Sequence, residues 1–249
     1  MGALSAAGGF STAAGTSARL RPVFARAAVG RLVELARSCG DKRDARVLSL
    51  DARTGILVGQ LARAGTSCWA VDPEPTLALR LQRSLPQVAV SCTEMSALAV
   101  QTASFDLVCV GGLGEQPETQ PDFAETRRVL HPGAVFAQVF NLVDLSLIWM
   151  QDLAERIELD RNLRLSELQV SLSAAGFSES NMELFANPLR TSVDLEFERL
   201  RDTAQLLAID EAHEAALLSA AKELLFAQAD SAGAVERSQQ TVLRYWRAV

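Results

Sequence analysis

A short turn, Asp51–Gly55, and a carboxylate about twenty residues beyond it, Asp72, have the types and spacing that suit a nucleoside-binding site. In a sheet of parallel strands, the turn after the first strand brings backbone N–H groups to a ligand. Small residues are needed there, because a Cβ atom would collide. A carboxylate at the end of the second strand can accept hydrogen bonds from ribose hydroxyls. The alternative is that Asp72 caps the helix that follows it.

Few side chains are available for general-base or metal chemistry. The chain has two histidines, His131 and His213, and one tyrosine, Tyr245. We expect His131, in the sequence LHPG, to be a turn residue, and we name no catalytic residue. Because the four cysteines show no C-x-x-C spacing, the sequence predicts no metal site and free buried thiols in a reducing compartment. They are Cys39, Cys68, Cys92 and Cys109.

Composition narrows the classes of partner. With 249 residues, 49% of them hydrophobic, the chain can bury one sizeable core. Its formal net charge of −6 and pI near 5.1 speak against nucleic acid, whose binding needs many Lys and Arg side chains. No apolar run reaches the ~18 residues that span a bilayer.

The first part of the chain is compatible with two cellular compartments. Arg19, Arg21, Arg26 and Arg31 occur before the first acidic residue, Glu34. This Arg-rich, acid-poor composition is typical of an organelle transit peptide, so the mitochondrial matrix is one alternative. The other is a flexible leader over residues 1–20, followed by a helix over 22–37, in a cytoplasmic protein.

In the central part of the chain, segments with the hydrophobic pattern of a strand alternate with segments that have the pattern of a helix. The pattern predicts strands at 46–50, 67–72, 87–93, 105–113 and 134–142, and intervening helices at 55–65, 73–86 and 122–130. Strands that alternate with helices favour right-handed crossovers and a mostly parallel, doubly wound α/β sheet. Its ligand site is expected at the carboxyl ends of the strands.

The remaining segments are predominantly helical. We expect helices at 142–159 and 164–177, a strand at 180–185, helical structure over 193–229 and a last strand at 239–249. We interpret residues 21–249 as one domain with helical additions at about 142–172 and 193–230. These additions could cover the crevice, pack on the sheet, or form an oligomer contact.

Five stretches in order carry a resemblance to a known family: VLSLDARTG, AVDPEP, TEMSALAVQTASFDLV, FAETRRVLHPGAVFAQ and LSAAGF. Together they resemble class I S-adenosylmethionine-dependent methyltransferases, in particular the small-molecule type related to ubiquinone- and biotin-pathway methylases. The similarity runs from about residue 45 to 185 and includes the last strand. It implies a Rossmann-like, doubly wound, seven-stranded sheet with helices on both faces and a helical cap or C-terminal insertion.

The resemblance also implies roles for individual residues. Asp72, followed by Pro73, matches the acid that binds ribose, and Glu94 matches the acid that meets the adenine amino group. Met95 would pack on the purine plane. Gly111 falls where the fourth strand ends beside the transferred methyl group. The alternatives are a solvated loop carboxylate for Glu94 and a core position for Met95.

The turn after the first strand departs from the family pattern. Ser49 replaces an acid that steadies the methionine end of the cofactor, and Asp51 and Arg53 replace the first two glycines. Only Gly55 remains. An inward-pointing Arg53 would fill the cofactor pocket and place a cation near the sulfonium, whereas a salt bridge with Asp51 could turn it aside.

Three functions follow from this departure. The first is a small-molecule methyltransferase that holds acceptor and methyl group in line. The second is an inactive scaffold or assembly subunit of the same fold that acts through a protein partner. The third is a crevice in which Arg53 binds a carboxylate or phosphate of another ligand.

Overall fold

The computed structural model describes residues 21–39, 44–112, 121–143, 147, 151, 172–206 and 211–249. The leader expected over residues 1–20 lies outside them. The chain divides into two compact units. The larger comprises Val23–Leu142, Gln169–Ala186 and Thr241–Val249, and the smaller comprises Met1–Pro22, Val143–Leu168 and Asn187–Gln240.

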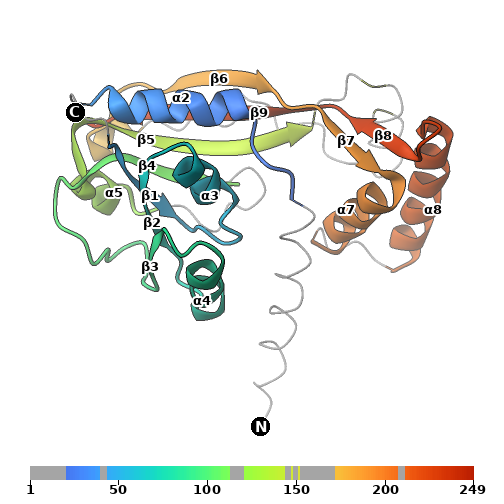
Figure 1. The fold of residues 1–249 in the computed structure, drawn as a ribbon, viewed down its shortest axis with the longest axis horizontal. Coiled ribbons are helices and arrows are strands. Elements are labelled where there is room, and N and C mark those ends of the chain that lie inside the picture. Colours follow the sequence, from blue (N-terminus) through green and yellow to red (C-terminus); the bar gives the residue numbers. More distant parts are fainter. Residues whose placement is uncertain are drawn as a thin grey trace, which may run out of the picture. The chain divides into compact units, whose positions relative to one another are not determined.

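Seven strands form one sheet, as the sequence predicts. Their order is β3 (Ala89–Ser91), β2 (Ser67–Val71), β1 (Arg46–Leu50), β4 (Phe105–Gly111), β5 (Leu130–Val143), β9 (Gln239–Arg247) and β6 (Asn181–Ala186) (Figure 1). The strands from β3 to β5 pair in parallel. The last strand runs in the opposite direction to β5, because Ala248 bonds to Ala134 and Thr241 bonds to Asn141.

The order of the strands reverses next to β1. From β1 the chain moves outward through β2 and β3, and it then returns to add β4 and β5 on the other side. In doubly wound sheets, ligands bind at the carboxyl ends of the strands beside such a reversal. The predicted turn Asp51–Gly55 leaves β1 at this point.

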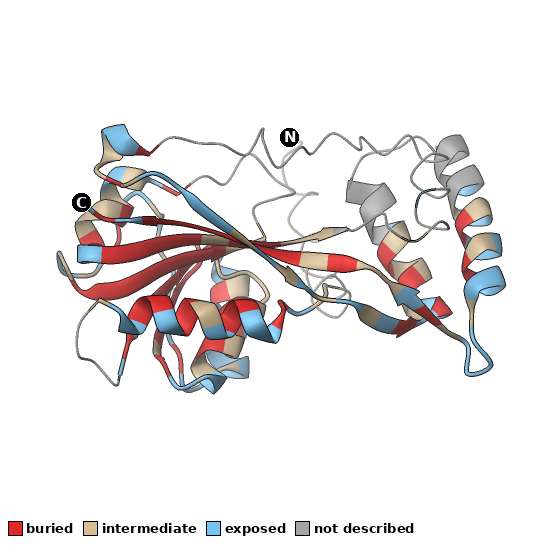
Figure 2. Ribbon diagram, turned by 90° about the horizontal axis from the view of Figure 1, so that it is seen from above, coloured by how far each residue is buried: buried red, intermediate tan, exposed pale blue. Residues whose placement is uncertain are grey.

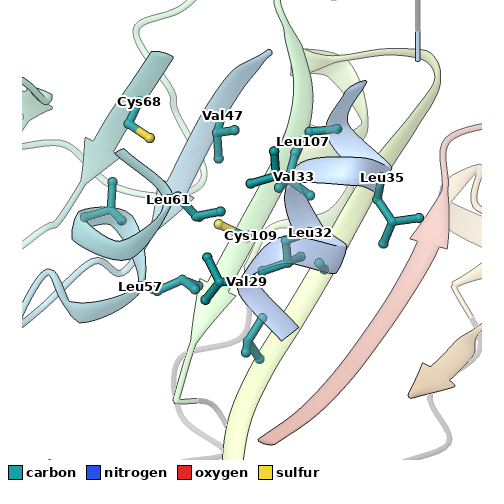
Figure 3. Packing of buried hydrophobic residues seen from close by; sticks show 14 of the residues in the cluster. Val29, Leu32, Val33, Leu35, Val47, Leu57, Leu61, Cys68, Leu107 and Cys109 are labelled. Atoms are coloured by element: carbon teal, nitrogen blue, oxygen red, sulfur yellow. The ribbon is translucent and has the colours of Figure 1, made fainter. Parts of the chain in front are cut away.

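Helices cover both faces of this sheet. Helices α2 (Arg26–Arg37), α3 (Ile56–Arg63) and α4 (Pro75–Ser84) pack on one face. The short helices α5 (Phe123–Val129) and η2 (Ser173–Ala175) lie on the other. Figure 3 shows side chains of α2 and α3 meeting Val47, Leu107 and Cys109 of the strands. The central strands β1, β4 and β9 are mostly buried, whereas β3 and β6 at the two edges of the sheet are partly exposed (Figure 2).

The smaller unit joins two short strands to two helices. Strands β7 (Leu189–Ser192) and β8 (Ala234–Arg237) pair antiparallel beside α7 (Val193–Leu206) and α8 (Glu211–Gln228). The Glu196 carboxylate, 1% exposed, lies 3.0 Å from Arg199 and 2.6 Å from Arg237. Two cations thus neutralise this buried anion, which would otherwise be costly to desolvate.

Several predicted elements differ at their ends. The first helix begins at Arg26 rather than residue 22, and residues 142–143 belong to β5 rather than to a helix. Most of the helices predicted at 142–159 and 164–177 falls outside the described residues; the described end of the second is the 3-10 helix η2. The HPG turn at 131–133 lies within β5, where the pairing with β4 shifts between Phe105 and Leu107. The strands β7 and β8 were not predicted.

In the part of the chain that the structure describes, no helix combines the length and apolar character needed to cross a membrane.

The packing of α4 against the turn requires a glycine at position 55. Gly55 is the N-cap of α3, with φ of +74°. A Cβ atom there would lie 2.5 Å from Leu81 Cδ2 and 3.0 Å from Leu85 Cδ1. The residue is therefore fixed both by its backbone conformation and by the closeness of α4 to α3.

Gly55→Ala tests this constraint, with Gly133→Ala as the matched control. Gly133 has φ of +77° but nothing within 4 Å of its Cβ position. Both changes should lower the free energy of unfolding by about 1–2 kcal/mol through left-handed strain. Gly55→Ala should cost at least ~1 kcal/mol more, because the methyl group overpacks the core. Equal losses in urea unfolding would contradict this account.

Candidate functional site

Three alternating residues of the turn after β1 adopt left-handed backbone conformations. The φ angles are +46° at Asp51, +44° at Arg53 and +74° at Gly55. Two hydrogen bonds fold the turn, from Ala52 N to Val71 O at 3.1 Å and from Gly55 N to Ala52 O at 2.7 Å. The backbone thus keeps a conformation that favours glycine, although two of the three glycines are absent. Each such residue costs about 1–2 kcal/mol.

The buried carboxylate of Asp72 holds the turn in place. Its Oδ2 accepts a hydrogen bond from Arg53 N at 2.7 Å, and its Oδ1 accepts one from Glu74 N at 3.0 Å. The side chain is 1% exposed. Burial raises the pKa of Asp72, and the two backbone N–H groups oppose that shift. Glu74, not Asp72, caps α4, because its side chain accepts from Thr76 N.

The Arg53 side chain is bound to Asp51. Its Nε lies 2.9 Å from Asp51 Oδ2, and the exposed fractions of the two side chains are 28% and 7%. From the sequence, this salt bridge was the alternative to an Arg53 side chain that points into the cofactor pocket. The pair is electrically neutral, so the ionised form of Asp72 leaves the group with a net negative charge. Such a group attracts a cation rather than repelling it.

Two further predicted site residues are part of the packed core. Ser49 is 2% exposed, pairs with Cys109 across β1 and β4, and hydrogen-bonds to that thiol. A Cβ atom on Gly111 would lie 3.2 Å from Leu57 Cβ and 3.4 Å from Phe24 Cζ. The small residue at the end of β4 is thus needed for helix packing, whatever else it does.

The predicted adenine-side residues follow β3. Glu94 is exposed, and its carbonyl accepts from Ala97 N at 3.2 Å in a turn. Met95 is half-buried and packs against the apolar cluster below the turn. The carbonyl of Pro73 accepts a long bond, 3.7 Å, from Cys92 Sγ, so the segments after β2 and β3 meet there. The ligand roles of Glu94, Met95 and Pro73 stay predictions.

Of the three titratable candidates for a general base, the two whose side chains are described lie away from this edge of the sheet. His131 is at the start of β5, 3.9 Å from Asp106 at the start of β4, which is the opposite edge. The Tyr245 hydroxyl donates to Glu183 beside α2. The side chain of His213 lies outside the described residues. Among those residues, no group of three or more His, Cys, Asp or Glu side chains is arranged to hold a metal ion.

An ion pair on α5, not singled out from the sequence, supports the segment after Met95. Arg128 bonds to Glu125 at 2.7 Å and to the carbonyls of Leu98 and Val100. Glu125 accepts from Leu98 N at 2.8 Å, and the pKa of its carboxyl is lowered by Arg128. The i,i+3 spacing of the two charges was the available signal, but such pairs are common on helix surfaces.

Comparison with known proteins agrees with this fold. Residues 47–133 match the family model described as a methyltransferase domain. Relatives described as uncharacterized methyltransferases occur in Mycobacterium bovis and Mycobacterium tuberculosis. Each is 31% identical over 151 residues, which is 61% of this chain and 59% of the relative. The matched region thus spans less than two thirds of these relatives.

Solved structures share the fold at lower identity. The YcgJ protein of Bacillus subtilis aligns with a TM-score of 0.56 and 14% identity over 90% of this chain and 99% of its own. A structure from Anaeromyxobacter dehalogenans aligns with a TM-score of 0.57 and 20% identity over 92% and 97%.

The strand order is that of a Rossmann-like α/β fold, which solved methyltransferase structures share. Within that fold, residues 47–133 are similar to a methyltransferase domain, and 151 residues are similar to relatives described as methyltransferases.

Asp72→Ala tests the role of this carboxylate in holding the turn. The change leaves the N–H groups of Arg53 and Glu74 without their charged acceptor, so the free energy of unfolding should fall by about 1–3 kcal/mol. Asp72→Asn keeps one carbonyl oxygen and should cost less. The control is Asp122→Ala, which removes an exposed acceptor for Glu125 N at the start of α5. If Asp72→Ala cost no more than this control in urea unfolding, Asp72 would not hold the turn.

Proposed function

We propose that the chain is an S-adenosylmethionine-dependent methyltransferase that acts on a small molecule. The observation that carries the proposal is the left-handed backbone at Asp51 and Arg53. Strained residues persist where the surrounding structure determines them, and they concentrate at functional sites. A turn that no longer served a ligand could relax once its glycines were lost, whereas this turn keeps the conformation at a cost.

The residues present suit the charge of the cofactor. S-adenosylmethionine carries a sulfonium cation and supplies the methyl group as an electrophile. The neutral Asp51–Arg53 pair beside ionised Asp72 gives the turn a net negative charge. A carboxylate offers about four lone-pair sites, and two hydrogen bonds to Asp72 leave capacity for ribose hydroxyls.

The acceptor is proposed to be activated by its own acidity and by alignment with the methyl group. His131 and Tyr245 lie away from the turn, so they do not supply a base. Holding two reactants in line can by itself contribute a large part of a rate enhancement. The net charge of −6 favours a small molecule over nucleic acid as the acceptor.

One observation favours the inactive scaffold as a second candidate. Asp72 is 1% exposed and already holds two backbone N–H groups. A ribose can reach its remaining lone pairs only if the groups covering it move. If they do not move, the buried carboxylate serves the fold alone.

Calorimetric titration with S-adenosylmethionine and S-adenosylhomocysteine separates these functions, using the full chain and Arg53→Gly. The proposal predicts that the unaltered protein binds both compounds. Binding only by Arg53→Gly would instead identify a scaffold whose pocket the arginine has closed. Binding by neither protein, together with stabilisation by inorganic phosphate, would identify a crevice that takes other anions.

The class of acceptor is tested on the same protein by following S-adenosylhomocysteine release. Cell extract is divided into a low-molecular-weight fraction and a macromolecular fraction, and each is supplied with S-adenosylmethionine. Release with the first fraction alone is expected. Release with the macromolecular fraction alone would contradict the small-molecule assignment.

A further inference from the structure

Two charged residues of opposite sign stand at glycine positions of the turn, so that the negative charge of one balances the positive charge of the other. Asp51 and Arg53 both stand where the resemblance expects glycine, and they form an ion pair at 2.9 Å. Aspartate tolerates left-handed backbone better than most residues, because its short polar side chain can bond locally. Arg53 has no such local preference, so its side chain is placed by what it contacts.

The ion pair is asymmetric in its burial. The Asp51 side chain is 7% exposed and the Arg53 side chain is 28% exposed. The Arg53 backbone is also fixed, because its N–H donates to Asp72 at 2.7 Å. Asp51 is therefore the more buried partner of the pair, with its carboxylate next to the guanidinium.

We propose that Asp51 is a positioning residue that holds the Arg53 guanidinium and cancels its charge, so that the turn accepts a ligand bearing a cation. The inference rests on the proposed function, because it takes the sulfonium of S-adenosylmethionine as that cation. It also assigns the pair a selective role: the charge balance sets the preference between the sulfonium cofactor and its uncharged thioether product.

The preference follows from a count of charges. Asp51, Arg53 and ionised Asp72 sum to −1, from two negative groups and one positive group. Asp51→Asn raises the sum to 0, Arg53→Gln lowers it to −2, and the double variant restores −1. S-adenosylmethionine and S-adenosylhomocysteine differ by the methyl group and one positive charge. The ratio of their affinities therefore separates this electrostatic effect from a change in the shape of the site, which would affect both compounds alike.

The experiment measures both dissociation constants for the four proteins by calorimetry at low ionic strength. Asp51→Asn should lower the preference for S-adenosylmethionine by about tenfold relative to the unaltered chain. Arg53→Gln should raise it, and the double variant should return it to the original value. Asparagine keeps the size of aspartate and tolerates the left-handed backbone, and glutamine keeps an unbranched polar side chain, shorter than that of arginine, without the charge.

Asp44→Asn is the matched control. It removes the same charge from the same unit, but from an exposed carboxylate that accepts a hydrogen bond from Ser67 at the start of β2, at the opposite edge of the sheet. Its affinity ratio should stay that of the unaltered protein. Thermal unfolding of each variant verifies that it is folded.

The two proposals fail in different ways. If none of the proteins bound either compound, the proposed function would be contradicted, and this inference with it. If all four bound both compounds with one constant ratio, only the role of Asp51 would be contradicted. The same would hold if Asp51→Asn weakened both compounds equally, since a purely structural role acts on both alike.

Discussion

The hydrogen bond from Arg53 N to Asp72 Oδ2 is the interaction on which the site depends. It joins the turn after β1 to the end of β2, and its acceptor is almost wholly removed from solvent. Because a buried carboxylate without a hydrogen-bond donor is costly in free energy, this bond stabilises the conformation of the turn. That shape includes left-handed backbone at two residues that are not glycine.

On the proposed function, the same bond lets a turn that contains an arginine serve the cofactor. The bond fixes the Arg53 backbone, and the Arg53 side chain is paired with Asp51, whose Oδ2 lies 2.9 Å from Arg53 Nε. The cation that seemed incompatible with a sulfonium is thereby paired before any ligand arrives. The proposed ligand interacts with the summed charge of Asp51, Arg53 and Asp72, and no single one of these residues determines that sum.

The sequence predicts the sheet well because each strand and helix has its own periodicity. The strand Arg46–Leu50 and the helix ending near Gly65 follow from local pattern and from a left-handed glycine. The partners β7 and β8 were missed because each is only four residues long and the two are far apart in the sequence. Periodicity over so few residues carries little signal.

The site was only partly predictable. Spacing pointed to Asp72 and the turn, but the direction of the Arg53 side chain depends on its contacts, including the ion pair with Asp51, which a sequence can only suggest. The packing roles of Ser49 and Gly111 needed the positions of Cys109 and Leu57. The oligomer contact expected from the C-terminal helices stays a prediction, as does the compartment.

The most direct test is a crystal structure of the unaltered protein grown with S-adenosylhomocysteine. The account predicts a nucleoside over the turn, its ribose hydroxyls on Asp72, and the Arg53 guanidinium still on Asp51. A guanidinium lying across the turn, with no nucleoside bound at saturating concentration, would contradict it.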